Sequence, residues 1–248
     1  MENVVKYAER PELNDPVFIE GLPGVGNVGK IAADYLAEKL GAVKFADIYS
    51  KHFPPQVMPD HECVAHMACN KLYYVKNAGG RDLIFLLGDF QGLTPEGQYE
   101  LADLVLSEAI SFNVSKVFTL GGYGTGNVVE TPRVLGAVSH AEMKKELEKH
   151  GVTFIPGEPG AGIIGASGLI LGMCGVKGLD AACLMGETSG YFVDHKSSGI
   201  LLRVLMSILG ISVDTGELDE RSQQLDEFTA KMKEIAEGQN RDSLGYFG

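Results

Sequence analysis

The residues that most suggest chemistry are the glycines of the segment Gly21 to Gly29, which reads GLPGVGNVG and follows a short apolar run. Gly24, Gly26 and Gly29 match the pattern GxGxxG between a predicted strand and a predicted helix. In dinucleotide-binding proteins such glycines let the backbone approach a pyrophosphate, and an acidic residue further along the chain binds the ribose. Asp47 lies at a suitable distance in sequence for that acid. The segment therefore predicts, as one alternative, a nucleotide site.

A phosphate-binding loop with magnesium is a poorer match to the same segment. Residues Gly24 to Lys30 fit GxxxxGK, but Ile31 stands where the metal-binding hydroxyl of Ser or Thr is required. A dinucleotide site also conflicts with Pro23 and with the Pro-rich stretch 52–59, because a second right-handed βαβ repeat should continue there. An enzyme, or a nucleotide- or nucleoside-binding protein that uses the glycine-rich loops, remains the alternative interpretation.

Glycine clusters follow several other predicted strands, at 88–92, 121–126, 157–162 and 186–190. Loops at the carboxyl ends of parallel strands gather on one rim of an open sheet, and ligands commonly bind there. We therefore expect a cleft at this rim.

Side chains able to do acid–base chemistry are expected on the same rim or on the Pro-rich loop. They are Asp89, Tyr123, Glu130, Glu158, Glu187, Asp194 and His195 on the rim, with His52 and Asp60 on the loop. Asp194 and His195 are adjacent in sequence and so rarely face each other, and a helix cap explains the aspartate without a reaction. Because no HExxH, GxSxG or metal-ligand spacing appears, we predict no catalytic residue, metal or cofactor.

Composition and charge exclude some classes of partner. The 248-residue chain carries 33 acidic and 21 basic residues, which give a net charge of −12. A sequence-independent grip on DNA or RNA needs clustered Lys and Arg, so we expect no nucleic-acid partner. No window approaches 18 consecutive apolar residues, and the first residues do not form a basic and then apolar leader. We expect a soluble cytoplasmic protein that does not contact membranes.

Short apolar runs alternate with amphipathic stretches, which is typical of an α/β domain. Predicted strands cover 17–20, 43–49, 63–67, 72–76, 82–88, 117–121, 152–155 and 180–185, and predicted helices cover 28–40, 95–112, 167–173 and 196–209. Thr94 and Pro95 mark one helix start, and Ser139 with Glu142 forms a capping box for a short charged helix. No linker-like break interrupts this pattern, so residues 1–215 are predicted to form a single domain.

The residues after this domain differ in kind. Apolar side chains recur at spacings of 7, 3, 4 and 3 in Leu218, Leu225, Phe228, Met232 and Ile235. This rhythm predicts an amphipathic helix over 216–238. Its apolar side either packs on the domain or pairs with a second copy as a coiled-coil seam.

The final segment, 239–248, is polar but ends in Tyr246, Phe247 and Gly248. We expect a flexible tail, because its composition does not favour regular structure. A flexible end cannot bury two aromatic rings by itself. The Tyr–Phe pair is therefore expected either to dock on its own domain or to insert into another protein.

Five motifs, in order along the chain, resemble the proteasome assembly chaperone family in its archaeal branch. They are GLPGVGNVG from Gly21, FPPQV from Phe53, LGGYGTG from Leu120, GASGL from Gly165 and LMGETSG from Leu184. The resemblance implies a three-layer α/β/α fold with a mostly parallel central sheet, akin to nucleoside phosphorylases. It also implies a homo-oligomer, not an enzyme, that helps to assemble the α-ring of the 20S proteasome without ATP.

The resemblance further implies a role for the C-terminus. Proteasome activators and some of these chaperones end in a hydrophobic–tyrosine–any motif that enters pockets between neighbouring α-subunits. Tyr246 takes the hydrophobic place, Phe247 the tyrosine place and Gly248 the free end. Phe247 lacks the tyrosine hydroxyl, so one hydrogen bond is absent, at an expected cost of about 0.5–1.5 kcal/mol. These three residues are the predicted partner-binding site.

Overall fold

The computed structural model describes residues 2–160 and 162–224. By its internal contacts the chain divides into two units, Met1–Val213 and Asp214–Gly248. In the second unit a helix begins at Gly216 and is described as far as residue 224. The predicted apolar positions from Leu225 onwards and the predicted binding residues 246–248 lie outside the described residues.

A nine-stranded sheet in the order β1-β3-β6-β7-β2-β8-β11-β9-β10 forms the centre of the first unit. The strands are β1 (Val4–Tyr7), β2 (Val17–Gly21), β3 (Val43–Tyr49), β6 (Asn70–Ala78), β7 (Arg81–Gly88), β8 (Lys116–Gly124), β9 (Val134–Val138), β10 (Val152–Thr153) and β11 (Ala181–Thr188). The four middle strands, β7, β2, β8 and β11, are parallel. On one side β6 joins β7 antiparallel, and on the other β9 joins β11 antiparallel. The sheet is therefore mixed, with a parallel centre.

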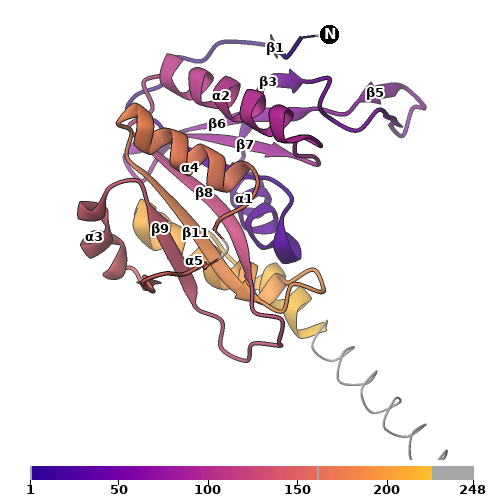
Figure 1. Cartoon of the computed structure of the whole chain (residues 1–248). Coiled ribbons are helices and arrows are strands. Elements are labelled where there is room, and N and C mark those ends of the chain that lie inside the picture. Colours follow the sequence, from indigo (N-terminus) through magenta and orange to yellow (C-terminus); the bar gives the residue numbers. More distant parts are fainter. Residues whose placement is uncertain (1, 161, 225–248) are drawn as a thin grey trace, which may run out of the picture. The chain divides into compact units, whose positions relative to one another are not determined.

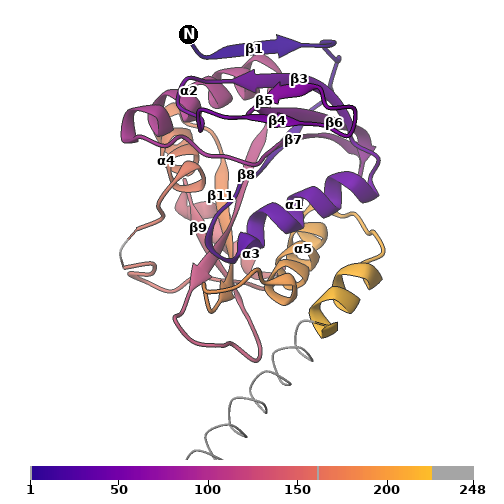
Figure 2. The same ribbon diagram turned by 90° about the vertical axis from the view of Figure 1, so that its right-hand side faces the viewer.

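Helices cover both faces of this sheet. They are α1 (Val28–Lys39), α2 (Pro95–Ser111), α3 (Lys144–Glu148), α4 (Ala166–Lys177) and α5 (His195–Leu209), with the 3-10 turns η1 (Val25–Asn27) and η2 (Ala141–Met143). The pair α2 and α4 lies on one face, and the pair α1 and α5 lies on the other (Figures 1 and 2). The predicted three-layer α/β/α fold is confirmed. Within the part of the chain that the structure describes, no helix is long and apolar enough to span a membrane.

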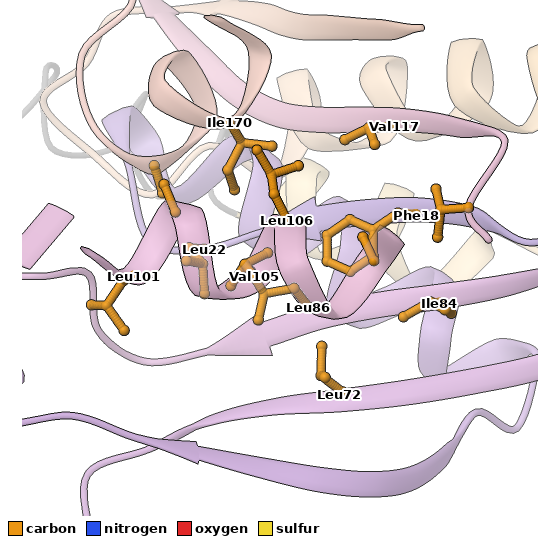
Figure 3. Close-up of a cluster of buried hydrophobic side chains, with 14 of the residues drawn as sticks. Phe18, Leu22, Leu72, Ile84, Leu86, Leu101, Val105, Leu106, Val117 and Ile170 are labelled. Carbon is orange, nitrogen blue, oxygen red and sulfur yellow. The ribbon is translucent and has the colours of Figure 1, made fainter. Parts of the chain in front are cut away.

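The core follows from the apolar runs of the central strands. Every residue of β2 is buried, so alternate side chains of this strand enter the two helical layers. Phe18 pairs across the sheet with Ile84 and Val117, and these side chains lie beneath α2 and α4. Figure 3 shows them in one cluster of buried side chains with Leu101, Val105, Leu106 and Ile170. Each fully buried side chain of this size contributes about 1.5–3 kcal/mol of transfer free energy.

The local signals that start two helices are confirmed. Thr94 caps α2 by accepting a hydrogen bond from the Gly97 amide at 3.1 Å. Asp194 caps α5 by accepting one from the Ser197 amide at 2.8 Å. Such caps satisfy backbone donors that have no partner inside the helix.

The predicted capping box at Ser139 is wrong. His140 precedes η2, and no side chain caps this turn. The Ser139 hydroxyl instead donates to the Leu179 carbonyl at 3.0 Å and accepts from the Ala181 amide at 2.8 Å. A contact with the start of β11 has therefore replaced a local one.

The Pro-rich stretch and the run that follows it differ from expectation. Val57–Pro59 forms the short strand β4, and Ala65–Met67 forms β5. The two strands pair antiparallel in a separate two-stranded sheet and do not join the main one. The prolines limit this segment because each removes a backbone donor.

Helix α1 lies directly on the sheet where glycines replace side chains. A Cβ at Gly29 would lie 2.1 Å from the Leu120 carbonyl oxygen of β8. A Cβ at Gly21 would lie 2.2 Å from the Cβ of Ala33 on α1. Since such distances are far below van der Waals contact, only glycine permits this packing.

Replacing Gly29 with alanine tests this contact. Gly29→Ala forces α1 away from β8, so we expect the free energy of unfolding to fall by about 1–3 kcal/mol in chemical denaturation. Gly172→Ala in α4 is the matched control, because no atom lies within 4 Å of the Cβ position there. The control is expected to leave stability unchanged or to raise it by up to about 1 kcal/mol. Equal losses in both variants would contradict the close-packing explanation.

Candidate functional site

An open cleft with a volume of about 790 Å³ lies at the carboxyl ends of the parallel strands. The loop after β2 contributes Leu22 and Val25, and the end of β8 contributes the stretch 120–124. The segment before α4 adds Ile163, and β11 adds Met185. The cleft predicted from the glycine clusters is therefore present at this rim.

The first glycine loop is closed on one side by protein atoms. Gly26 has a φ of +61°, and a Cβ there would lie 3.0 Å from the Thr188 side-chain oxygen. The Gly26 carbonyl accepts a hydrogen bond from the Asp194 amide at 2.9 Å. The chain between β11 and α5 thus packs against the middle of the loop, whereas Gly24 borders the cleft and has no atom within 4 Å of its Cβ position.

The structure does not bring Asp47 to this glycine loop. Asp47 lies on β3, and β6 and β7 separate that strand from β2. Its carboxylate accepts hydrogen bonds from Lys44 Nζ at 3.0 Å to both oxygens. A ribose-binding acid must lie beside the glycine turn. In the alternative dinucleotide site of Gly24, Gly26, Gly29 and Asp47, the role of ribose-binding acid for Asp47 is therefore wrong.

Beneath the cleft lies a buried carboxyl group, that of Glu20 on β2, which has no exposed surface. Its oxygens accept hydrogen bonds from the Leu22 amide at 3.1 Å and from Ser167 Oγ at 2.8 Å. Burial raises the pKa of Glu20 to about 7, although these hydrogen bonds oppose the rise. No basic side chain among the described residues contacts it. We did not predict this residue, and its signal was a lone acid inside the apolar run VFIEG.

Two of the predicted rim candidates meet at the cleft wall. Tyr123 Oη donates a hydrogen bond to Glu158 Oε2 at 2.8 Å. This bond, more than burial, raises the pKa of the Tyr123 hydroxyl. The tyrosine thus remains a neutral donor, and the second Glu158 oxygen is left for other donors.

The remaining predicted candidates do not line the cleft, and several of them form ion pairs or a helix cap within the protein. Asp89 pairs with Lys30 at 3.2 Å, His52 with Glu100 at 2.8 Å and Asp60 with His66 at 2.8 Å. Glu130 is exposed, and His195 is the first residue of α5. The Asp194 carboxylate accepts hydrogen bonds from the Ser197 amide and hydroxyl, which is the cap of α5. Among the described residues, no group of three acidic, His or Cys side chains is placed to hold a metal.

Glu187 is held by Arg133. Its Oε2 accepts hydrogen bonds from Arg133 Nε and from the Arg133 amide, both at 3.0 Å. The hydrogen bond with the guanidinium lowers the pKa of this carboxyl. The Arg133–Glu187 ion pair thereby links the start of β9 to the end of β11, which is a structural role.

The buried Glu20 makes a prediction about pH. Since its folded-state pKa lies above the ordinary value of 4.5, its contribution to stability is full below pH 4.5 and is lost as the pH rises through 7. Glu20→Gln removes this titration. From pH 4 to pH 8, the unfolding free energy of the variant minus that of the wild type is expected to rise by about 3 kcal/mol.

Chemical denaturation of both proteins across this pH range measures that difference. Glu62→Gln, at an exposed position on the β4–β5 turn, is the control and is expected to show no such slope. A flat difference for Glu20→Gln would mean that this carboxyl titrates at its ordinary pKa.

Known proteins share both the sequence pattern and this architecture. The sequence profile of the PAC2 family matches residues 18–233. The uncharacterized protein MJ1210 from Methanocaldococcus jannaschii is 34% identical over 232 residues, which cover 94% of this chain and 88% of that protein.

Two crystal structures from Pyrococcus furiosus are similar over nearly their full lengths. PbaB, an archaeal proteasome activator, matches with a TM-score of 0.87 at 36% identity, covering 94% of this chain and 99% of PbaB. PbaA, an archaeal homolog of proteasome-assembly chaperone, matches with a TM-score of 0.78 at 29% identity, covering 98% and 97%. As its motifs predicted, the chain belongs to the PAC2 family, in the branch of the archaeal proteasome assembly chaperones.

Proposed function

We propose that this protein is an ATP-independent proteasome assembly chaperone that binds 20S α-subunits through Tyr246, Phe247 and Gly248. The observation that carries the proposal is the likeness over nearly the whole chain to PbaB, a proteasome activator, at 36% identity. The aromatic C-terminus supports it, because these residues follow the order of the docking motif with one substitution.

The first glycine loop supports a role that needs no ATP and no catalysis. In nucleotide-binding proteins, glycines at this place leave room for phosphate oxygens. Here Gly29 admits a β8 carbonyl, and Gly26 admits the chain between β11 and α5. Ile31 also provides no hydroxyl for magnesium. Gly26 and Gly29 are thus used for packing within the protein.

Tail binding rests on two interactions that the sequence provides. The rings of Tyr246 and Phe247 bury apolar area in a pocket, and the terminal carboxylate of Gly248 pairs with a basic side chain there. A single tail of this kind binds weakly. Several tails on one homo-oligomer raise the avidity by about 10²–10⁴ when their spacing lets them engage together.

Deleting residues 246–248 tests the tail mechanism. The full chain lacking these residues is expected to lose measurable binding to immobilised α-subunits in surface plasmon resonance, because rings and carboxylate are removed together. Ser243→Ala in the same segment is the control and is expected to bind like the wild type. Unchanged affinity after the deletion would rule out tail-mediated binding.

Restoring the tyrosine hydroxyl tests the pocket more finely. Phe247→Tyr adds one hydrogen-bonding group, so we expect the affinity per tail to rise by about 2- to 10-fold, which corresponds to 0.5–1.5 kcal/mol. Tyr246→Phe changes a hydroxyl at the neighbouring position and is expected to leave the affinity nearly unchanged. The opposite ranking of the two variants would contradict the assignment of Phe247 to the tyrosine place.

A further inference from the structure

The cleft at the strand ends has the chemistry of a site for positive ligands. Among the described residues that line it, none is Lys, Arg or His, and Glu158 is the charged one. Leu22, Ile163 and Met185 add apolar walls. Phosphate groups are normally held by basic side chains or free backbone amides. A ligand with N–H donors and an apolar body fits this lining better.

Ser167 presents an oxygen acceptor at the base of this cleft. Its hydroxyl lies 2.8 Å from Glu20 Oε2 and 3.3 Å from the Leu120 carbonyl oxygen. When Glu20 is ionised, both neighbours accept hydrogen bonds only, so the serine proton points inward. The Ser167 lone pairs are then left for a donor in the cleft.

Among the residues that the structure describes, no basic side chain lies beside Glu20 to act as a countercharge. Cys183 is the titratable side chain that faces it from β11, and burial raises the pKa of that thiol to about 12, so it stays neutral. On its other sides lie the Thr119 hydroxyl of β8, the Ser167 hydroxyl of α4 and the apolar Leu86 of β7. A buried carboxylate without a cation costs free energy. A cation in the cleft, one hydroxyl away, reduces that cost.

We propose that this cleft binds a small organic ammonium ion, whose N–H groups donate to Ser167 Oγ and Glu158 while its apolar part lies against Leu22, Ile163 and Met185. The ionised form of Glu20 favours this ligand through Ser167. The inference does not depend on the tail mechanism, because it concerns another part of the chain.

Isothermal titration calorimetry on the full chain tests the site with 1,5-diaminopentane as the probe. At pH 8 the diamine is expected to bind about tenfold or more tightly than the neutral analogue 1,5-pentanediol, and inorganic phosphate is expected to give no binding. The amine stays charged between pH 6 and 8. Because the raised pKa of Glu20, about 7, leaves this carboxyl mostly protonated at pH 6 and mostly ionised at pH 8, the diamine affinity is expected to be lower at pH 6, by up to about tenfold.

Two variants separate the contributions. Glu20→Gln is expected to abolish the pH dependence and to bind the diamine at pH 8 about as weakly as the wild type does at pH 6. Ser167→Ala is expected to weaken diamine binding about tenfold by removing the acceptor. Glu62→Gln is the control for a lost carboxylate and is expected to change neither. All three are expected to bind α-subunits like the wild type, so loss of the site and loss of the tail mechanism are distinguishable.

Absent diamine binding, equal binding of the diol, tighter binding of phosphate, or a pH-independent affinity of the wild type would each overturn the proposal. If Glu20→Gln does not fold, the wild-type pH dependence and Ser167→Ala decide it.

Discussion

The direct contact of α1 with the backbone of β8 is the constraint on which the rest of the structure depends. It requires glycine at position 29, where a Cβ would overlap the Leu120 carbonyl. Because α1 lies so close to the sheet, the turn before it contacts the segment that follows β11. There the Gly26 carbonyl accepts a hydrogen bond from the Asp194 amide. Asp194 then caps α5, which packs beside α1 (Figure 2). One helix–strand contact thus sets the second helical layer and the form of the rim.

This constraint explains how a sequence with a nucleotide-type motif belongs to a chaperone family. Glycines permit close approach of any group, and the motif alone does not state which group approaches. Here the approaching groups are a β8 carbonyl and the connection to α5. The open part of the rim lies farther along, where hydroxyl and carboxylate oxygens outnumber positive charges. Packing therefore uses one part of the glycine-rich rim, and the site that we propose for a ligand uses another.

Secondary structure was predicted best from the sequence where local signals agree with the pattern of buried apolar residues. The run at Val17 and the Thr94 cap are examples, since apolar periodicity and cap chemistry act within a few residues. Prediction failed where distant contacts decide. Ser139 forms hydrogen bonds with Leu179 and Ala181 at the start of β11. The Glu20 carboxyl accepts a hydrogen bond from Ser167, which is 147 residues away in the sequence. Asp47 lies at a suitable spacing on the wrong strand, because the order of strands is not encoded locally. The C-terminal prediction lies outside the described residues.

The function we propose, from the family, the packed glycine loop and the aromatic C-terminus, is the binding of proteasome subunits without a nucleotide. Native mass spectrometry tests this most directly. The full chain is mixed with 20S α-subunits in nucleotide-free buffer, and the masses of the complexes are compared before and after ATP and magnesium are added. We predict complexes of the chain with α-subunits in both conditions, with the same stoichiometry. Complexes that form only after ATP is added, or no complexes in either condition, would contradict ATP-independent assembly.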